Sequence, residues 1–108
     1  MNIALPTVIA TYFDVSNGAD DVRLSDCFAP DALVRDEHQA HQGPEAIRLW
    51  LREARRKYQH RVAPLRLTRD GTRVTVTGQV SGNFPGSPLQ LDHVFELRDD
   101  KIQSLEIH

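Results

Sequence analysis

Several features that would assign the sequence to a special class of protein are missing. Its single cysteine, Cys27, can form no internal disulfide and has no second thiol with which to hold a metal, so we expect a small core residue beside Phe28. No apolar run approaches the roughly 20 residues that cross a bilayer. The first residues show neither a basic start nor an apolar stretch before a cleavage site, so we expect a soluble, cytoplasmic protein.

Neither sign of charge is in large excess. The formal net charge of −2 gives no general attraction for phosphate backbones or anionic membranes, so we expect neither nucleic acid nor membrane as a partner. Hydrophobic residues make up 40% and charged residues 26% of the chain, a balance typical of a folded globular protein. Because 108 residues have room for one hydrophobic core, we expect a single domain over residues 1–108.

Helical periodicity occurs in three segments. Apolar side chains recur every three or four positions over residues 5–16, and Asn17 with Gly18 is a typical helix stop. A short second helix follows, with Asp20 or Asp21 as its cap. The third helix, residues 44–58, has a wide apolar stripe opposite a row of arginines and is therefore amphipathic.

Alternating side chains predict strands. Residues 32–37 form one of them, with Val34 and Asp36 on the same face. Four more are expected after residue 60, at 62–69, 72–83, 89–97 and 102–107, each antiparallel to the one before it. Gly78 and Gly82 indicate bends or bulges in the longest strand. We therefore predict an α+β fold in which about three helices pack on the concave face of a cone-like, strongly curved antiparallel sheet and enclose an apolar pocket.

This order of elements resembles the cone-shaped nuclear transport factor 2-like superfamily over nearly the whole chain. Residues 27–36 look like its second helix and first strand, residues 43–48 like its G-x-x-A-I helix entry, and residues 91–95 like its penultimate strand. Within the superfamily the chain is similar to SnoaL-like polyketide cyclases and ketosteroid isomerases, which use the cone as a pocket for flat, hydrophobic, ketone-bearing molecules. The resemblance implies a small hydrophobic ligand, no cofactor, and a homodimer formed through the outer face of the sheet.

Three residues carry the resemblance to ketosteroid isomerases. Tyr12 falls at the family's oxyanion-hole tyrosine, and Asp36, at the family's spacing from it, falls at the catalytic base. Asp92 falls at the carboxylic acid that the family keeps protonated. The chain departs from the pattern at Glu37, where those enzymes have proline, and at Leu51, where some have a tyrosine that supports the oxyanion tyrosine.

The proposed chemistry explains these residue types. Moving a double bond into conjugation with a ketone requires a base that takes a proton from one carbon and returns it to another, which suits a partly buried carboxylate such as Asp36. The enolate formed on the way concentrates negative charge on one oxygen, which needs donors already aimed at it. The hydroxyl of Tyr12 and a neutral Asp92 would be those donors, because an apolar site can hold a carboxylic acid protonated.

The orientation of Asp92 is the open point. Strict alternation places it in one row with Gln90 and Val94, whereas the opposite row, which contains His93, is more apolar. Either the pocket face is partly polar or Asp92 points to solvent, and we expect the first. The predicted pocket wall accordingly consists of Phe13, Val34, Trp50, Phe84, Gln90 and Val94.

His38 and His41 follow the predicted base closely. They could act as auxiliary general acids at the mouth of the pocket, whereas a metal site would need a further ligand that the sequence does not fix, so we expect no metal. The leading interpretation is an isomerase or cyclase that enolises a hydrophobic ketone. The alternative is a non-catalytic module of the same fold that binds a small ligand or dimerises.

Overall fold

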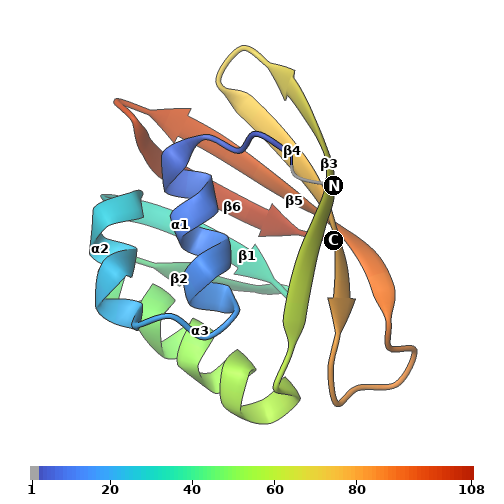
Figure 1. Cartoon of the computed structure of the whole chain (residues 1–108). Coiled ribbons are helices and arrows are strands. Elements are labelled where there is room, and N and C mark those ends of the chain that lie inside the picture. Colours follow the sequence, from blue (N-terminus) through green and yellow to red (C-terminus); the bar gives the residue numbers. More distant parts are fainter. Residues whose placement is uncertain (1–2) are drawn as a thin grey trace.

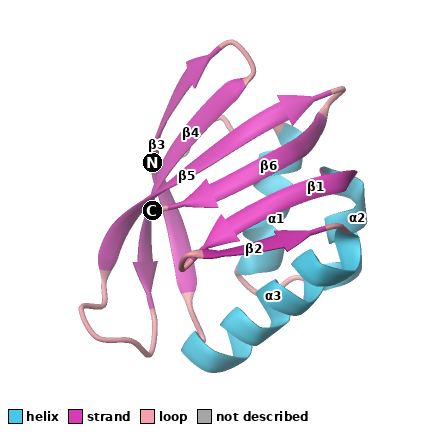
Figure 2. Cartoon of the chain, turned by 180° about the vertical axis from the view of Figure 1, so that it is seen from behind, coloured by secondary structure: helices cyan, strands magenta, loops and turns pink. Residues whose placement is uncertain are grey.

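Helices and strands lie in two layers in the computed structural model, which describes residues 3–108 (Figure 1). The helical segments are α1 (Thr7–Ser16), the 3-10 helix η1 (Asp21–Arg23), α2 (Leu24–Cys27) and α3 (Pro44–Tyr58). The strands are β1 (Phe28–Asp36), β2 (Gln39–Gln42), β3 (Arg61–Asp70), β4 (Arg73–Ser81), β5 (Leu89–Arg98) and β6 (Lys101–Ile107). The helices cover one face of the sheet and leave the other open, as the view from behind shows (Figure 2). Within residues 3–108 no helix has the length and apolar character needed to cross a membrane.

The six strands form one mixed sheet in the order β2-β1-β6-β5-β4-β3. The antiparallel meander predicted after residue 60 is confirmed, because β3 pairs with β4, β4 with β5 and β5 with β6. The sheet is not wholly antiparallel, since β1 runs parallel to β6. Strand β2 was missed: it is a short, polar edge strand that pairs only with β1, and it carries no apolar alternation that would predict it.

The core lies between the helices and the concave face of the sheet. Ile9, Tyr12 and Phe13 of α1 are at most 3% exposed, as the helical periodicity of this segment predicts, and Val15, outside the predicted stripe, is buried as well. Phe95 of β5 packs against the ring of Phe13 at 5.9 Å between centroids. Cys27 is buried as expected, and burial raises the pKa of its thiol to about 12, so it stays protonated and unreactive.

Gly78 of β4 and Gly82, which follows the end of this strand at Ser81, stand where other chain segments approach closely. A Cβ added at Gly78 would lie 2.8 Å from Cγ1 of Val62, and one added at Gly82 would lie 2.7 Å from the backbone oxygen of Tyr58. The pairing register of β3 shifts beside Gly78, between Pro64 and Arg66, so an irregularity does occur where the sequence predicts one. The sheet can therefore bend toward the helices at these positions.

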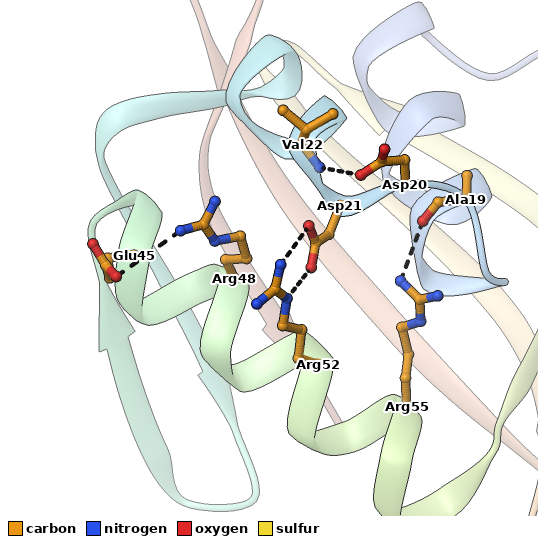
Figure 3. Close-up of polar contacts among 8 residues, drawn as sticks. All are labelled: Ala19, Asp20, Asp21, Val22, Glu45, Arg48, Arg52 and Arg55. Atoms are coloured by element: carbon orange, nitrogen blue, oxygen red, sulfur yellow. Dashed lines mark hydrogen bonds and ion pairs between the residues drawn. The ribbon is translucent and has the colours of Figure 1, made fainter.

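Helix α3 is attached to the preceding segment by its arginines (Figure 3). The guanidinium of Arg52 donates to both carboxylate oxygens of Asp21, with 3.2 Å between Nη2 and Oδ1, and this hydrogen bond holds the pKa of Asp21 below its usual value. Arg55 donates from Nη1 to the backbone oxygen of Ala19 at 3.2 Å. Asp20 caps η1, as predicted, by accepting from the backbone N–H of Val22 at 3.1 Å. The contacts of Arg52 and Arg55 fix the end of the cavity that α3 forms.

Candidate active site

A cavity of about 920 Å³ opens between the helical layer and the concave face of the sheet. Its wall draws on α1, α3, the end of β1 with the turn that follows, and residues of β2 to β6. The polar and aromatic side chains of this wall include those of Tyr12, Asp36, Trp50, His60, Phe84 and His93. Two of the three predicted catalytic residues, Tyr12 and Asp36, are therefore brought to one cavity.

Asp36 ends strand β1 with its carboxylate in the cavity wall. Alternation along the strand places it on the same face as Val34, which is completely buried, so the carboxylate enters the apolar side of the sheet. The indole Nε1–H of Trp50 donates to Oδ2 of Asp36 at 3.1 Å. Burial raises the pKa of Asp36, although the Trp50 hydrogen bond opposes that rise. A half-buried carboxylate of this kind binds a proton more readily than one in water, which suits a general base.

Tyr12 lies deeper, on the face of α1 that packs on the sheet. Only 2% of it is exposed, and its ring makes edge-to-face contacts with Phe13, Phe28 and Phe95 at 5.2 to 5.9 Å between centroids. Burial raises the pKa of the phenol well above its usual value, and the negative charge of Asp36 adds to that effect. The hydroxyl therefore keeps its proton at neutral pH and can act as a hydrogen-bond donor.

Ser16 and His60 form a contact that the sequence did not predict. Ser16 follows Tyr12 by one helical turn, and its Oγ lies 2.9 Å from Nε2 of His60. Asn17 holds α1 against β3 beside this contact, because its side chain exchanges two hydrogen bonds with the backbone of Val62, at 2.9 and 2.8 Å. Burial lowers the pKa of His60. The four-residue spacing of Tyr12 and Ser16 was visible in the sequence, but their partner was not.

The prediction that Asp92 faces the pocket was wrong. Its Oδ1 accepts a hydrogen bond from the hydroxyl of Thr77 at 2.7 Å, across the β4–β5 pair, and Asp92 is absent from the cavity wall. Gln90 and Val94 share this outer face, so they are not wall residues either. The physical reason is the strand alternation itself, which directs the more apolar row of β5 to the concave face.

His93 takes the inward position instead. It is 2% exposed, lines the cavity, and packs its ring edge-to-face on Phe13 at 5.2 Å between centroids. Burial lowers the pKa of His93 to about 4, so the imidazole is neutral at pH 7. The sequence signal was present, since His93 lies in the apolar row, but the resemblance to isomerases favoured its neighbour.

The remaining predicted wall residues divide evenly. Trp50 and Phe84 line the cavity, and Phe84 packs edge-to-face on the ring of Tyr58 at 5.9 Å between centroids. Phe13 and Val34 do not line it, because both are buried in the core between the helices and the sheet.

The mouth of the cavity is formed by the turn between β1 and β2. The hydroxyl of Tyr58 donates to Oε1 of Glu37 at 2.8 Å and so connects this turn to the end of α3. His38 lines the cavity here, whereas His41 lies outside the wall with its ring 6.0 Å from that of Trp50. In the described part of the chain, no three His, Cys, Asp or Glu side chains are grouped so that they could hold a metal ion.

The fold and the cavity together define a protein with the nuclear transport factor 2-like, or ketosteroid isomerase-like, fold. The model of the SnoaL-like domain matches residues 9–105, and the chain belongs to this family. A solved structure of a candidate polyketide cyclase from Sinorhizobium meliloti is 42% identical, covers 96% of this chain and 95% of its own, and has a TM-score of 0.93. None of the curated proteins compared with the sequence matches it.

Two more distant structures show the same fold. A ketosteroid isomerase-like protein from Catenulispora acidiphila, solved with trimethylamine, is 20% identical with a TM-score of 0.84, and covers 97% of this chain and 86% of its own. A candidate isomerase of the SnoaL-like family from Agrobacterium tumefaciens is 17% identical with a TM-score of 0.79, and covers 94% and 92%. The predicted fold class is therefore confirmed.

Proposed function

We propose that the protein is an enzyme that enolises a small, hydrophobic, ketone-bearing molecule, with Asp36 as the base and Tyr12 as a donor to the enolate oxygen. The observation that carries this function is that a half-buried carboxylate with a raised pKa and a buried, protonated phenol line one cavity. General-base catalysis needs the first group and stabilisation of the developing oxyanion needs the second.

The reaction would proceed in two steps. The carboxylate of Asp36 takes a proton from the carbon beside the ketone. The electron pair of that C–H bond forms a carbon–carbon double bond, and the π pair of the ketone moves to its oxygen, which accepts a hydrogen bond from Tyr12. In an isomerase, protonated Asp36 returns the proton to a different carbon of the conjugated system. In a cyclase, the enolate carbon attacks a second carbonyl of the same molecule, and the proton goes to the new alkoxide.

The relatives support this reaction class. The 42% identical structure from Sinorhizobium meliloti is described as a candidate polyketide cyclase, and such an enzyme uses a base to form a carbon nucleophile. The absence of Asp92 from the wall counts against a copy of the ketosteroid isomerase site with its second acid. It also favours the alternative, a non-catalytic module whose cavity binds the same kind of molecule.

Hydrogen exchange separates the two functions. 2-Tetralone, a small bicyclic ketone, is incubated with the protein in deuterium oxide, and the loss of its proton signals beside the carbonyl is followed by NMR. We expect catalysed exchange that Asp36→Asn abolishes and Tyr12→Phe slows by about a hundredfold, in the range of one lost oxyanion donor. Asp92→Asn is the matched control and should leave the rate unchanged, because that carboxylate lies on the outer face. Binding of the ketone without exchange would establish the binding module instead.

The outer face of the sheet is where we propose that two copies pair. The helices leave this face uncovered (Figure 2), and the half-buried side chain of Val94 lies on it beside Asp92. Sedimentation equilibrium should give the mass of a dimer that Val94→Lys converts to a monomer. If the wild type is a monomer, the proposal that two copies pair is refuted.

A further inference from the structure

His93 has a buried nitrogen with no hydrogen-bond partner. Its Nδ1 is closed off from solvent, and it stands alone among the buried side-chain nitrogens and oxygens of residues 3–108 in having no partner. Buried polar atoms are nearly always paired, so an unpaired one in a cavity wall calls for a reason. Gly78 leaves space beside the ring, since a Cβ there would lie 3.3 Å from Cε1 of His93.

The unpaired Nδ1 determines which nitrogen of the neutral ring carries the proton. A neutral imidazole has one N–H and one bare nitrogen, and burying an unpaired N–H is less favourable than burying an unpaired lone pair. The unpaired Nδ1 therefore favours the tautomer with the proton on Nε2. Because the ring lines the cavity while Nδ1 is closed off, Nε2–H is the group left for a ligand.

We propose that His93 is a ligand-binding donor of this site, whose Nε2–H bonds the same ligand oxygen that accepts from Tyr12. This inference rests on the proposed function, because it gives His93 the place that the resemblance to isomerases assigned to Asp92. The rings of Tyr12 and His93 both pack edge-to-face on Phe13 at 5.2 Å between centroids, and both residues line the cavity. A neutral N–H stabilises negative charge on oxygen without giving up its proton.

The first test observes the wild-type site, and a variant serves only to assign its signals. Protein labelled with nitrogen-15 in its five histidines is examined by NMR at pH 7, and the His93 signals are assigned by their loss in His93→Gln. We expect a neutral ring protonated on Nε2, and a change in the Nε2 signal when 2-naphthol, a mimic of an enolised ketone, is added. A ring protonated on Nδ1, a charged ring, or an Nε2 signal that 2-naphthol leaves unchanged would overturn the proposal.

The second test measures 2-naphthol binding by titration. His93→Leu, which has no donor, should bind about tenfold more weakly than the wild type, the usual effect of one lost hydrogen bond, whereas His93→Gln should stay within about threefold. His41→Gln is the control, because His41 lies outside the cavity wall. Equal binding by His93→Leu and the wild type, or no binding by the wild type, would overturn the proposal.

The test of His93 and the test of the enzymatic function can fail separately. If the wild type fails to exchange 2-tetralone but His93→Leu still weakens 2-naphthol binding, the enzymatic function is refuted and the ligand-binding role of His93 stands. If the exchange of 2-tetralone depends on Asp36 but 2-naphthol binds equally well to His93→Leu and the wild type, only the role of His93 is refuted. Should His93→Leu fail to unfold cooperatively in urea, the NMR experiment on the wild type decides.

Discussion

Replacing Trp50 with phenylalanine isolates what the indole N–H does for the proposed base. In the wild type this N–H donates to Oδ2 of Asp36 at 3.1 Å and so stabilises the charged carboxylate. Hydrogen bonds to charged groups contribute about 1.5 to 3 kcal/mol, and the low end applies because Asp36 is only half buried. About 1.5 kcal/mol corresponds to roughly one pH unit. Trp50→Phe should therefore raise the pKa of Asp36 by about one further pH unit.

The shift can be followed in two ways. Carbon-13 NMR of the carboxyl groups gives the titration of Asp36 in both proteins, with Asp36→Asn to assign the signal. Trp50 is the single tryptophan of the chain, so the fluorescence of the wild type should also change as Asp36 titrates, and Asp36→Asn should lose that change. If Asp36 is the base, the acid side of the pH profile for 2-tetralone exchange should move up by the same amount in Trp50→Phe.

The direction of the change is decisive. With the donor removed, burial and the nearby charge of Glu37 still favour the protonated acid, against smaller opposing effects of the Glu37 backbone and His41. An unchanged or lowered pKa in Trp50→Phe would mean that the indole does not hold the carboxylate. The geometry on which the base depends would then be refuted.

Three further predictions concern stability. Burial raises the pKa of folded Asp36 above its unfolded value, so the folded wild type gains stability as the pH falls through that raised pKa. Asp36→Asn should therefore be more stable than the wild type in urea unfolding at pH 8. A difference in stability that does not shrink below pH 4 would contradict this. Asn17→Ala removes two hydrogen bonds to the backbone of Val62 and should lower the free energy of unfolding by about 2 kcal/mol in the same assay. Asn17→Asp keeps the acceptor and should lower it by about half as much. Equal losses of stability in the two variants would be inconsistent with the pairing. Gly82→Ala places a Cβ 2.7 Å from the backbone oxygen of Tyr58 and should lower the free energy of unfolding by about 2 kcal/mol, which is seen as a lower melting temperature. An unchanged melting temperature would show that the two segments are free to separate.

Local patterns were sufficient to predict most of the fold. The amphipathic helix at Pro44–Tyr58 and the alternating strands after residue 60 have periods that only one secondary structure satisfies, and both are present. The same alternation placed Asp36 on the face of Val34, and the cavity contains it. Strand β2 escaped because an edge strand needs backbone pairing alone, and its polar residues Gln39–Gln42 carry no apolar pattern.

The site was harder to predict because its members meet only in three dimensions. His60 reaches Ser16 after a left-handed turn at Gln59, where φ is 48°, and no local pattern in the sequence marks that turn. The error at Asp92 had a different cause. The hydrophobic pattern of β5 favours the face that carries His93 as the one turned toward the core, whereas the family resemblance favours the face that carries Asp92.

A crystal structure with 2-naphthol bound would show whether Tyr12 and Asp36 act on one ligand. We expect the molecule to lie in the cavity with its oxygen within hydrogen-bond distance of the Tyr12 hydroxyl and its ring carbons beside the carboxylate of Asp36. A molecule bound outside the cavity, or one whose oxygen points away from Tyr12 toward the mouth at Glu37, would contradict it.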